Sequence, residues 1–500
     1  MKFLKSIVPL VVFICSVLKG NTQVVDSMMG VLANQYPQQK VYVHFDKSVY
    51  RPGETIWFKA YLFAGFEPSN FSKNFFAELI DQNGTVLQRK VCPIVEASAA
   101  GNFDLLPTQN NNVFFRAYTS WMLNSDTAFI FKRDITVVSS EPNKFKQVPE
   151  VLVTQLKLFP ESGDLVNEVE SVVAFMATNN KGKPVKVTGD IKNSTGETIT
   201  SFKAQHDGMG TFLLLPKPNE TYTAFYTDEF GKQGSVALPA AKANGVVLQI
   251  NSSGNKKVFI VKRGALADGL ETVNIVAHMA QQIVYKAKVP LKETIVNSGA
   301  IPASALPTGI LQLTVFSDRW EPLAERIVFV NNDNYKFEAS LTTPITNLGK
   351  RGKNIFEINV EDTLLANMSI SITDAEIGRT STEDNIISGL LLSGDIKGII
   401  YNPTYYFANN ADSTVNNLDL VMLTHGWRRF NWQYITRPRK PFIKYPADQP
   451  LALIAKVFGV NPSSPIRPDE TMTVILQTKD STTNWCSMQV FYPYQIGSII

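Results

Sequence analysis

The chain has 500 residues, enough for about three to five domains of roughly 100–200 residues each. Charged residues make up 18% of it and hydrophobic residues 44%, which is the composition of a globular rather than a disordered protein. The formal net charge is +4, but Lys2, Lys5 and Lys19 lie in the first 22 residues, and the rest has 45 basic and 44 acidic side chains. This balance argues against nucleic acid as a general partner, because phosphate binding needs a field of Lys and Arg.

Residues 1–22 have the features of a secretory signal peptide: a basic start, an apolar run over 7–18, and a plausible cleavage position after Thr22. The run is shorter than the roughly 20 residues that span a bilayer, so we expect an exported protein with no transmembrane span after signal removal. Cys15 follows Phe13-Ile14 rather than a small residue, which disfavours lipidation of Cys15 but leaves it open.

Only Cys92 and Cys486 remain after the signal, and they are far apart in the sequence. This is neither a disulfide framework nor a zinc-binding spacing. We expect both to be small buried hydrophobic residues.

After an N-terminal leader over 23–38, strand signals dominate the chain up to about residue 375. Val41, Val43 and Phe45 alternate with Tyr42 and His44 in the first of them. The residues from Tyr50 to Glu54 predict a turn, and Asn83-Gly84 predicts a β-hairpin. About seven such strands in 100 residues indicate an antiparallel β-sandwich.

Polar, proline-containing joints recur at a spacing that suits repeated sandwiches. The predicted fold class is therefore all-β, with tandem antiparallel β-sandwiches of immunoglobulin-like type and a few helices in the fourth unit. The fourth unit carries helical periodicity over 384–394 and from 416 to about 434. The predicted domains are residues 39–140, 147–240, 243–332 and 333–435, followed by a partial β-domain over 441–500.

The segment from Val41 to Tyr61 contains Asp46-Lys47 followed by Tyr50-Arg51-Pro52-Gly53-Glu54, and it resembles the second macroglobulin domain of the alpha-2-macroglobulin family. It is more similar still to large envelope proteins that continue into a carboxypeptidase-regulatory-like sandwich and a TonB-dependent-receptor plug domain. The segments 116–122, 323–329, 399–407 and 418–430 resemble the same group. The resemblance implies macroglobulin-like sandwiches, and for 441–500 part of the carboxypeptidase-regulatory-like domain.

Two departures limit this resemblance. Cys92 is followed by Pro93-Ile94 and Cys486 by Ser487-Met488, so the Cys-Gly-Glu-Gln thioester element is missing and covalent protease trapping is not expected. The sequence ends before a plug domain, which leaves two explanations open: the chain is a shortened relative, or it is part of a longer protein.

No catalytic motif stands out, and we expect no enzyme, cofactor or metal. His44, His206, His278 and His425 lie far apart, so structural roles are favoured over a metal site. Asp46, Lys47, Arg51 and Glu54 could form a catalytic charge cluster, but in a tight turn they are expected to bond the backbone and one another. A hydrolase with dispersed catalytic groups remains a minor alternative.

Between Asp419 and Asp448 the chain has six basic residues and no acid, interleaved with aromatic residues. This stretch is a possible partner surface, because Trp, Tyr and Arg are enriched at binding hot spots. The alternative is a helix whose aromatic side chains pack on the fourth sandwich while its arginines reach solvent. The residues proposed for the surface are Trp427, Arg428, Arg429, Phe430 and Trp432.

The predicted function is that of a non-enzymatic, exported binding or scaffold protein of the cell envelope. By resemblance, its location would be the periplasm, the outer membrane or the cell surface, and its partners would be outer-membrane proteins of a TonB-dependent uptake system. The alternative is an endopeptidase inhibitor of the alpha-2-macroglobulin type that lacks the thioester. No long bait loop stands out in the sequence, although residues 140–149 are expected to be exposed enough for proteolytic nicking.

Overall fold

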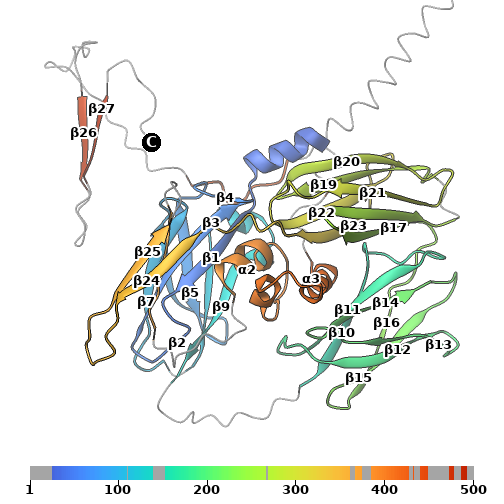
Figure 1. The fold of residues 1–500 in the computed structure, drawn as a ribbon, viewed down its shortest axis with the longest axis horizontal. Helices are drawn as coiled ribbons and strands as arrows, with labels where there is room; N and C mark the ends of the chain where they lie inside the picture. The colour runs from blue at the N-terminus through green and yellow to red at the C-terminus, as the bar shows by residue number, and fades with distance from the viewer. Residues whose placement is uncertain are drawn as a thin grey trace, which may run out of the picture. The chain divides into compact units, whose positions relative to one another are not determined.

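The structure is a computed structural model that describes residues 25–109, 111–138, 152–265, 269–360, 366–373, 384–426, 432 and 440–448, and the backbone of 472–477 and 486–491. The chain divides into a unit of residues Met1–Pro446 and a unit of Ala447–Ile500 (Figure 1). The predicted signal peptide, residues 140–149 and residues 427–430 lie outside the described residues.

The first sandwich is built from two sheets that share one core. One sheet pairs β1 (Gln39–Phe45), β3 (Thr55–Ala64), β4 (Glu67–Pro68) and β7 (Ser98–Asp104). The other has the order β2 (Val49–Tyr50), β9 (Phe131–Val137), β8 (Val113–Tyr118), β5 (Asn74–Ile80) and β6 (Val86–Pro93). Phe58 from the first sheet meets Phe115 from the second edge to face, with ring centroids 5.1 Å apart.

The second sandwich follows the same plan with fewer strands. Its sheets are β10 (Thr154–Pro160), β11 (Ser171–Asn179) and β14 (Met209–Leu214), and β13 (Thr198–Lys203), β12 (Val187–Asn193), β15 (Tyr222–Asp228) and β16 (Gln233–Ala237). Phe175 and Phe202, one from each sheet, lie in a common core with centroids 4.9 Å apart.

The third sandwich repeats the three-plus-four arrangement. Its sheets are β17 (Val246–Ser253), β18 (Lys256–Arg263) and β21 (Val296–Pro302), and β20 (Gln282–Pro290), β19 (Thr272–Met279), β22 (Gly309–Phe316) and β23 (Pro322–Val330). A single buried cluster joins both sheets, including Leu248, Phe259, Ile275 and Leu313. The predicted fold class, tandem antiparallel β-sandwiches, is therefore confirmed.

Local sequence signals explain much of this. Val41, Val43 and Phe45 point into the core as the alternation predicts. The predicted hairpin joins β5 to β6, and the Asp81 side chain accepts hydrogen bonds from the backbone N–H groups of Asn83 and Thr85 at 2.9 and 2.7 Å.

The range 333–435 differs from the sandwich predicted there. Its described residues form one two-stranded ribbon, β24 (Ala339–Ile345) and β25 (Ile355–Val360), and a set of helical segments. These are α2 (Ile386–Ser388), the π-helical turn η3 (Gly389–Ser393), the 3₁₀ helix η4 (Pro403–Phe407) and α3 (Asp412–Thr424). The helical residues bury their apolar side chains against the three sandwiches. In the described part of this range, the ribbon is therefore a two-stranded sheet without a second sheet packed on it.

Two further segments complete the described chain. Residues 25–35 form a helix whose Val25, Met29 and Leu32 share a buried cluster with Phe316 and Trp432. In the second unit, β26 (Met472–Gln477) pairs antiparallel with β27 (Cys486–Phe491).

Candidate functional sites

The turn from Tyr50 to Glu54 carries the macroglobulin-like motif between β2 and β3. Glu54 accepts hydrogen bonds from Lys47 Nζ and from the backbone N–H of Arg51, both at 2.7 Å. Gly53 has a φ of 80°, a left-handed conformation that suits glycine after Pro52. The turn is thus closed by its own charged side chains.

Asp46 holds the two strands that flank this turn. Its carboxylate accepts from the Tyr50 hydroxyl at 2.6 Å and from the backbone N–H of Trp57 at 3.0 Å. Burial and the hydrogen bond to Asp46 raise the pKa of Tyr50. Burial alone would raise the pKa of Glu54, but the bonds from Lys47 and Arg51 outweigh it and that pKa is lowered. Asp46, Lys47 and Glu54 are therefore bonded through their side chains to one another or to neighbours in and beside the turn, and Arg51 takes part through its backbone N–H.

A small cleft opens beside this motif. The motif end of β1, Arg133 of β9, Ser371, Thr373 and Asp384 line it. Burial raises the pKa of Asp384, and the nearby charge of Arg133 opposes part of that rise. The Arg133 guanidinium also lies over the Phe45 ring, 4.9 Å from its centroid.

A histidine and two serines meet in this cleft. Nδ1 of His44 lies 2.7 Å from Ser369 Oγ, and its Nε2 lies 3.4 Å from Ser371 Oγ. A Ser–His–Asp triad would need a carboxylate at Nδ1 to orient the ring, whereas here that position is occupied by a hydroxyl. The contacts instead hold residues 366–373 against the outer face of β1 and β3, where Lys59 Nζ also donates to the carbonyl oxygen of Met368 at 3.0 Å.

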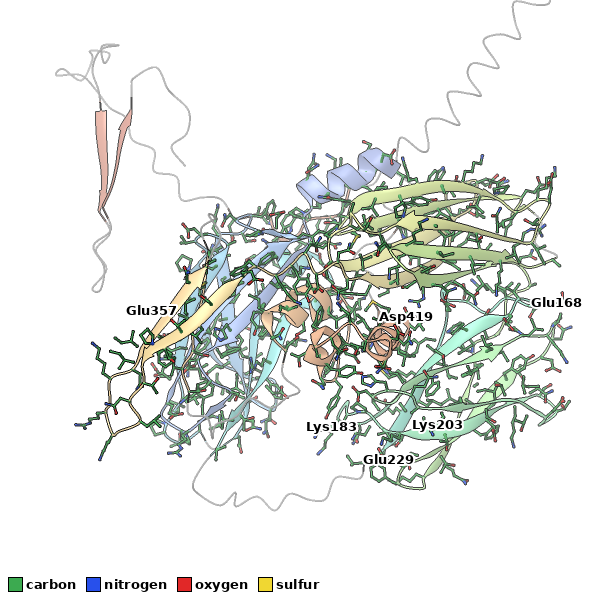
Figure 2. All side chains as sticks on the ribbon, viewed as in Figure 1. Glu168, Lys183, Lys203, Glu229, Glu357 and Asp419 are labelled. Carbon is green, nitrogen blue, oxygen red and sulfur yellow. The ribbon has the colours of Figure 1, made fainter. Side chains whose placement is uncertain are left out.

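Arg326, on β23, is a charged residue that is only 2% exposed. Its guanidinium donates to Glu161 at 3.0 Å and to both carboxylate oxygens of Asp419 at 2.9 and 2.8 Å. Glu161 follows β10 of the second sandwich, and Asp419, which is labelled in Figure 2, belongs to α3. Burial raises the pKa of Glu161, and Arg326 opposes that rise. One side chain thus joins the second sandwich, the third sandwich and α3.

The helical residues 384–426, hereafter the helical wedge, contact the first two sandwiches as well. Lys40 of β1 forms an ion pair with Asp395 at 2.6 Å. On the second sandwich, the Thr424 hydroxyl lies 3.2 Å from the sulfur of Met209, and the His206 ring stacks on Tyr405 at 4.7 Å. In Figure 1 the wedge appears in orange, and its α3 contacts β23 and β11.

The sequence did not single out this network, although a signal for it was present. Glu325 and Arg326 interrupt the apolar run from Leu323 to Val330. Charges in the middle of a buried strand need partners, because an unpaired buried charge is costly. Arg326 has Glu161 and Asp419, while Glu325 accepts hydrogen bonds from Gln312 and Thr314 at 2.9 and 3.1 Å.

The predicted partner surface is only partly described. Trp432 is 4% exposed, packs edge to face on Phe316 at 4.8 Å and donates its indole N–H to Glu325. Trp432 is therefore inaccessible to a partner. It is enclosed by the helix at residues 25–35 and by the third sandwich, whereas the sequence suggested packing on the fourth unit. Trp427, Arg428, Arg429 and Phe430 lie outside the described residues.

Further along the same basic stretch, Phe442 is 85% exposed. Its neighbours are fastened to the first sandwich, where the Asn124 side chain accepts from the backbone N–H groups of Lys444 and Tyr445 at 2.9 and 2.8 Å. The stretch therefore presents an aromatic side chain from a fixed backbone.

The remaining candidate groups are dispersed. His278 and His425 are buried, and burial lowers the pKa of each, that of His278 to about 4. Over the described ranges, no three His, Cys, Asp or Glu side chains gather as they would around a metal ion. Cys92 is a buried free thiol, and Cys486 begins β27. None of the helices in the described residues has the length and apolarity needed to cross a membrane.

Comparisons with known proteins give only distant similarities. No protein-family model matches the chain, and no curated protein matches it either. Among solved structures, a Salmonella alpha-2-macroglobulin is similar at 11% identity over 62% of this chain and 24% of that chain, with a TM-score of 0.18. An Escherichia coli alpha-2-macroglobulin activated by porcine elastase is similar at 15% identity over 61% and 32%, with a TM-score of 0.20.

The BSP domain of a biofilm-associated protein is similar at 11% identity, over 62% of this chain and 70% of that chain, with a TM-score of 0.21. The chain spans about a quarter to a third of the length of the two macroglobulins. Because these TM-scores are low, the fold assignment rests on the sheets and cores described above.

Proposed function

We propose that the chain is a non-enzymatic, exported scaffold that binds other proteins of the cell envelope. The observation that carries this proposal is the helical wedge, whose buried contacts connect three sandwiches. Sandwiches joined only by linkers are expected to move relative to one another. Here Arg326, Lys40 and Met209 each contribute a contact that such motion would break.

A connected array of this kind suits a protein that presents surfaces at fixed separations. Desolvating Arg326 and Glu161 is costly, so the pair is stabilising only while the sandwiches stay in register. The exposed Phe442, on a backbone bonded to Asn124, is a surface that such an array would hold in place.

The resemblance of the motif around Asp46 and Tyr50 to TonB-associated envelope proteins suggests the partner class. We propose outer-membrane proteins of a nutrient-uptake system as the binding partners. The predicted signal peptide supports export of the chain, and hence an encounter with these proteins.

A photo-crosslinking amino acid at Phe442, introduced in the natural host, tests this proposal. Crosslinked products from intact cells should contain outer-membrane proteins. The same crosslinker at Phe225, which is 46% exposed on the second sandwich, is the matched control and should capture fewer of them. Recovery of cytoplasmic proteins alone would contradict the proposal.

A further inference from the structure

The ribbon of β24 and β25 contains no buried residue. Each of the seven residues of β24 is exposed, and Leu341 and Phe356 are 65% and 48% exposed. A two-stranded ribbon is marginally stable in water, and an exposed apolar patch marks a surface that contacts another phase or protein. Figure 2 shows side chains extending from this ribbon, on which Glu357 is labelled.

The loop that joins the strands, residues 346–354, contains one exposed apolar residue that is followed by three basic residues. Leu348 is 96% exposed, the highest value among the exposed large hydrophobic residues. Lys350, Arg351 and Lys353 follow it, and the loop contains no acid. In the part of the chain that the structure describes, none of these three cations takes part in an ion pair.

The loop is ordered by its own hydrogen bonds. Asn354 accepts from the backbone N–H of Asn347 at 2.7 Å and donates to the Asn347 carbonyl at 3.3 Å, which closes the neck. Gly352 donates its N–H to the Gly349 carbonyl at 2.8 Å, and a Cβ on Gly352 would lie 2.5 Å from Asn347 Cγ. The loop therefore displays Leu348 and its cations in one preformed arrangement.

We propose that this loop attaches the protein to the surface of an anionic lipid bilayer. Leu348 enters the boundary between headgroups and acyl chains, while Lys350, Arg351 and Lys353 contact the headgroup phosphates with their stems along the apolar region. Charge complementarity favours this occupant, since each basic residue near an anionic leaflet adds to the attraction. The nearly complete exposure of Leu348 also leaves its side chain free to insert into a lipid surface.

Vesicle co-sedimentation of the exported chain, purified as cells process it, tests the proposal. The protein should sediment with vesicles of phosphatidylglycerol and phosphatidylcholine, but not with phosphatidylcholine alone. The variant K350E/R351E/K353E should bind the anionic vesicles about 100-fold more weakly, and Leu348→Ser about 10-fold more weakly.

The matched control is K181E/K183E/K186E, which makes the same change of charge on exposed lysines of the second sandwich. This control should weaken binding less than about threefold. Equal loss in both triple variants, or none in the loop variant, would overturn the proposal. So would binding to an acidic protein or to heparin without binding to vesicles.

Depth of insertion supplies a second readout that does not depend on loss of binding. Leu348→Trp should show fluorescence that brominated lipids quench more strongly than that of the unchanged protein. Absence of additional quenching on bound vesicles would show that Leu348 stays in water, and the proposal would fail.

Discussion

The helical wedge and the exposed ribbon come from the same predicted domain, yet they have opposite environments. Val421, Met422 and Leu392 of the wedge are fully buried, whereas β24 has no buried residue. Both segments are rich in apolar residues, so composition alone does not separate them. The difference is that the wedge has three sandwiches to pack against.

This contrast shows how a linear array of domains becomes one connected unit. Polar residues of the wedge reach buried partners on each sandwich, while the ribbon has only its own two strands. Substitutions in the wedge should therefore lower the free energy of unfolding, whereas substitutions in the ribbon should affect only the proposed binding to lipid vesicles.

The largest effect is expected from Arg326→Ala. Removing the guanidinium leaves Glu161 buried without its partner, and such losses typically cost about 3–5 kcal/mol. The midpoint of urea unfolding, followed by tryptophan fluorescence, should fall accordingly. The control Lys242→Ala removes an exposed pair with Asp164 and should cost at most about 1 kcal/mol. Equal shifts for both variants would contradict the role of Arg326 as an interdomain contact.

Truncating an apolar side chain in each region compares the two directly. Leu392 is 0% exposed, so Leu392→Ala should lower unfolding stability by about 2–5 kcal/mol through lost burial and a cavity. Leu341→Ala, in the ribbon, should change it by less than about 0.5 kcal/mol. The same unfolding midpoints measure both. A large loss from Leu341→Ala would mean that the ribbon contributes to folding and would remove the contrast.

The wedge should also respond to pH through His425. Burial lowers its pKa, so on acidification the unfolded chain takes up a proton near pH 6.5 that the folded chain does not. The contribution of neutral His425 to the free energy of unfolding is therefore complete above that pH, and it declines as the pH falls toward the lower pKa of the folded state. The unfolding midpoint of His425→Gln should decline less between pH 7.5 and 5.5 than that of the unchanged protein. Parallel declines would show that other groups account for the acid sensitivity.

The sequence predicted the sandwiches because their signals are local. Alternation in β1 and the Asn83-Gly84 turn depend on neighbouring residues, and both are found as expected. The helical periodicity after Asp384 likewise indicated the wedge. The turn residues Asp46 and Glu54 lie within a few positions of their partners, so their mutual bonding could also be anticipated.

What the sequence did not predict depends on long-range packing. Periodicity in 333–435 indicates apolar faces but not the surface that covers them. The described residues of this range form a two-stranded ribbon and the helical wedge, and the fourth sandwich stays a prediction. Trp432 was assigned to a partner surface because aromatic and basic residues suit one. Its actual partners, Phe316 and Glu325, lie more than a hundred positions earlier.

Among the contacts between the wedge and the sandwiches, the smallest effect is expected at the edge, where Lys397 pairs with Asp126 of the first sandwich at 2.5 Å. The bond from Lys397 and the N–H of Ala128 lower the pKa of Asp126, but both charged side chains are about a third or more exposed, so solvent screens the pair. Lys397→Met should cost less than about 1 kcal/mol, and the cost should shrink further in high salt. Unfolding midpoints at low and high salt measure this. A loss as large as that of Arg326→Ala, and unchanged by salt, would mean that burial is not what separates strong from weak contacts between the wedge and the sandwiches.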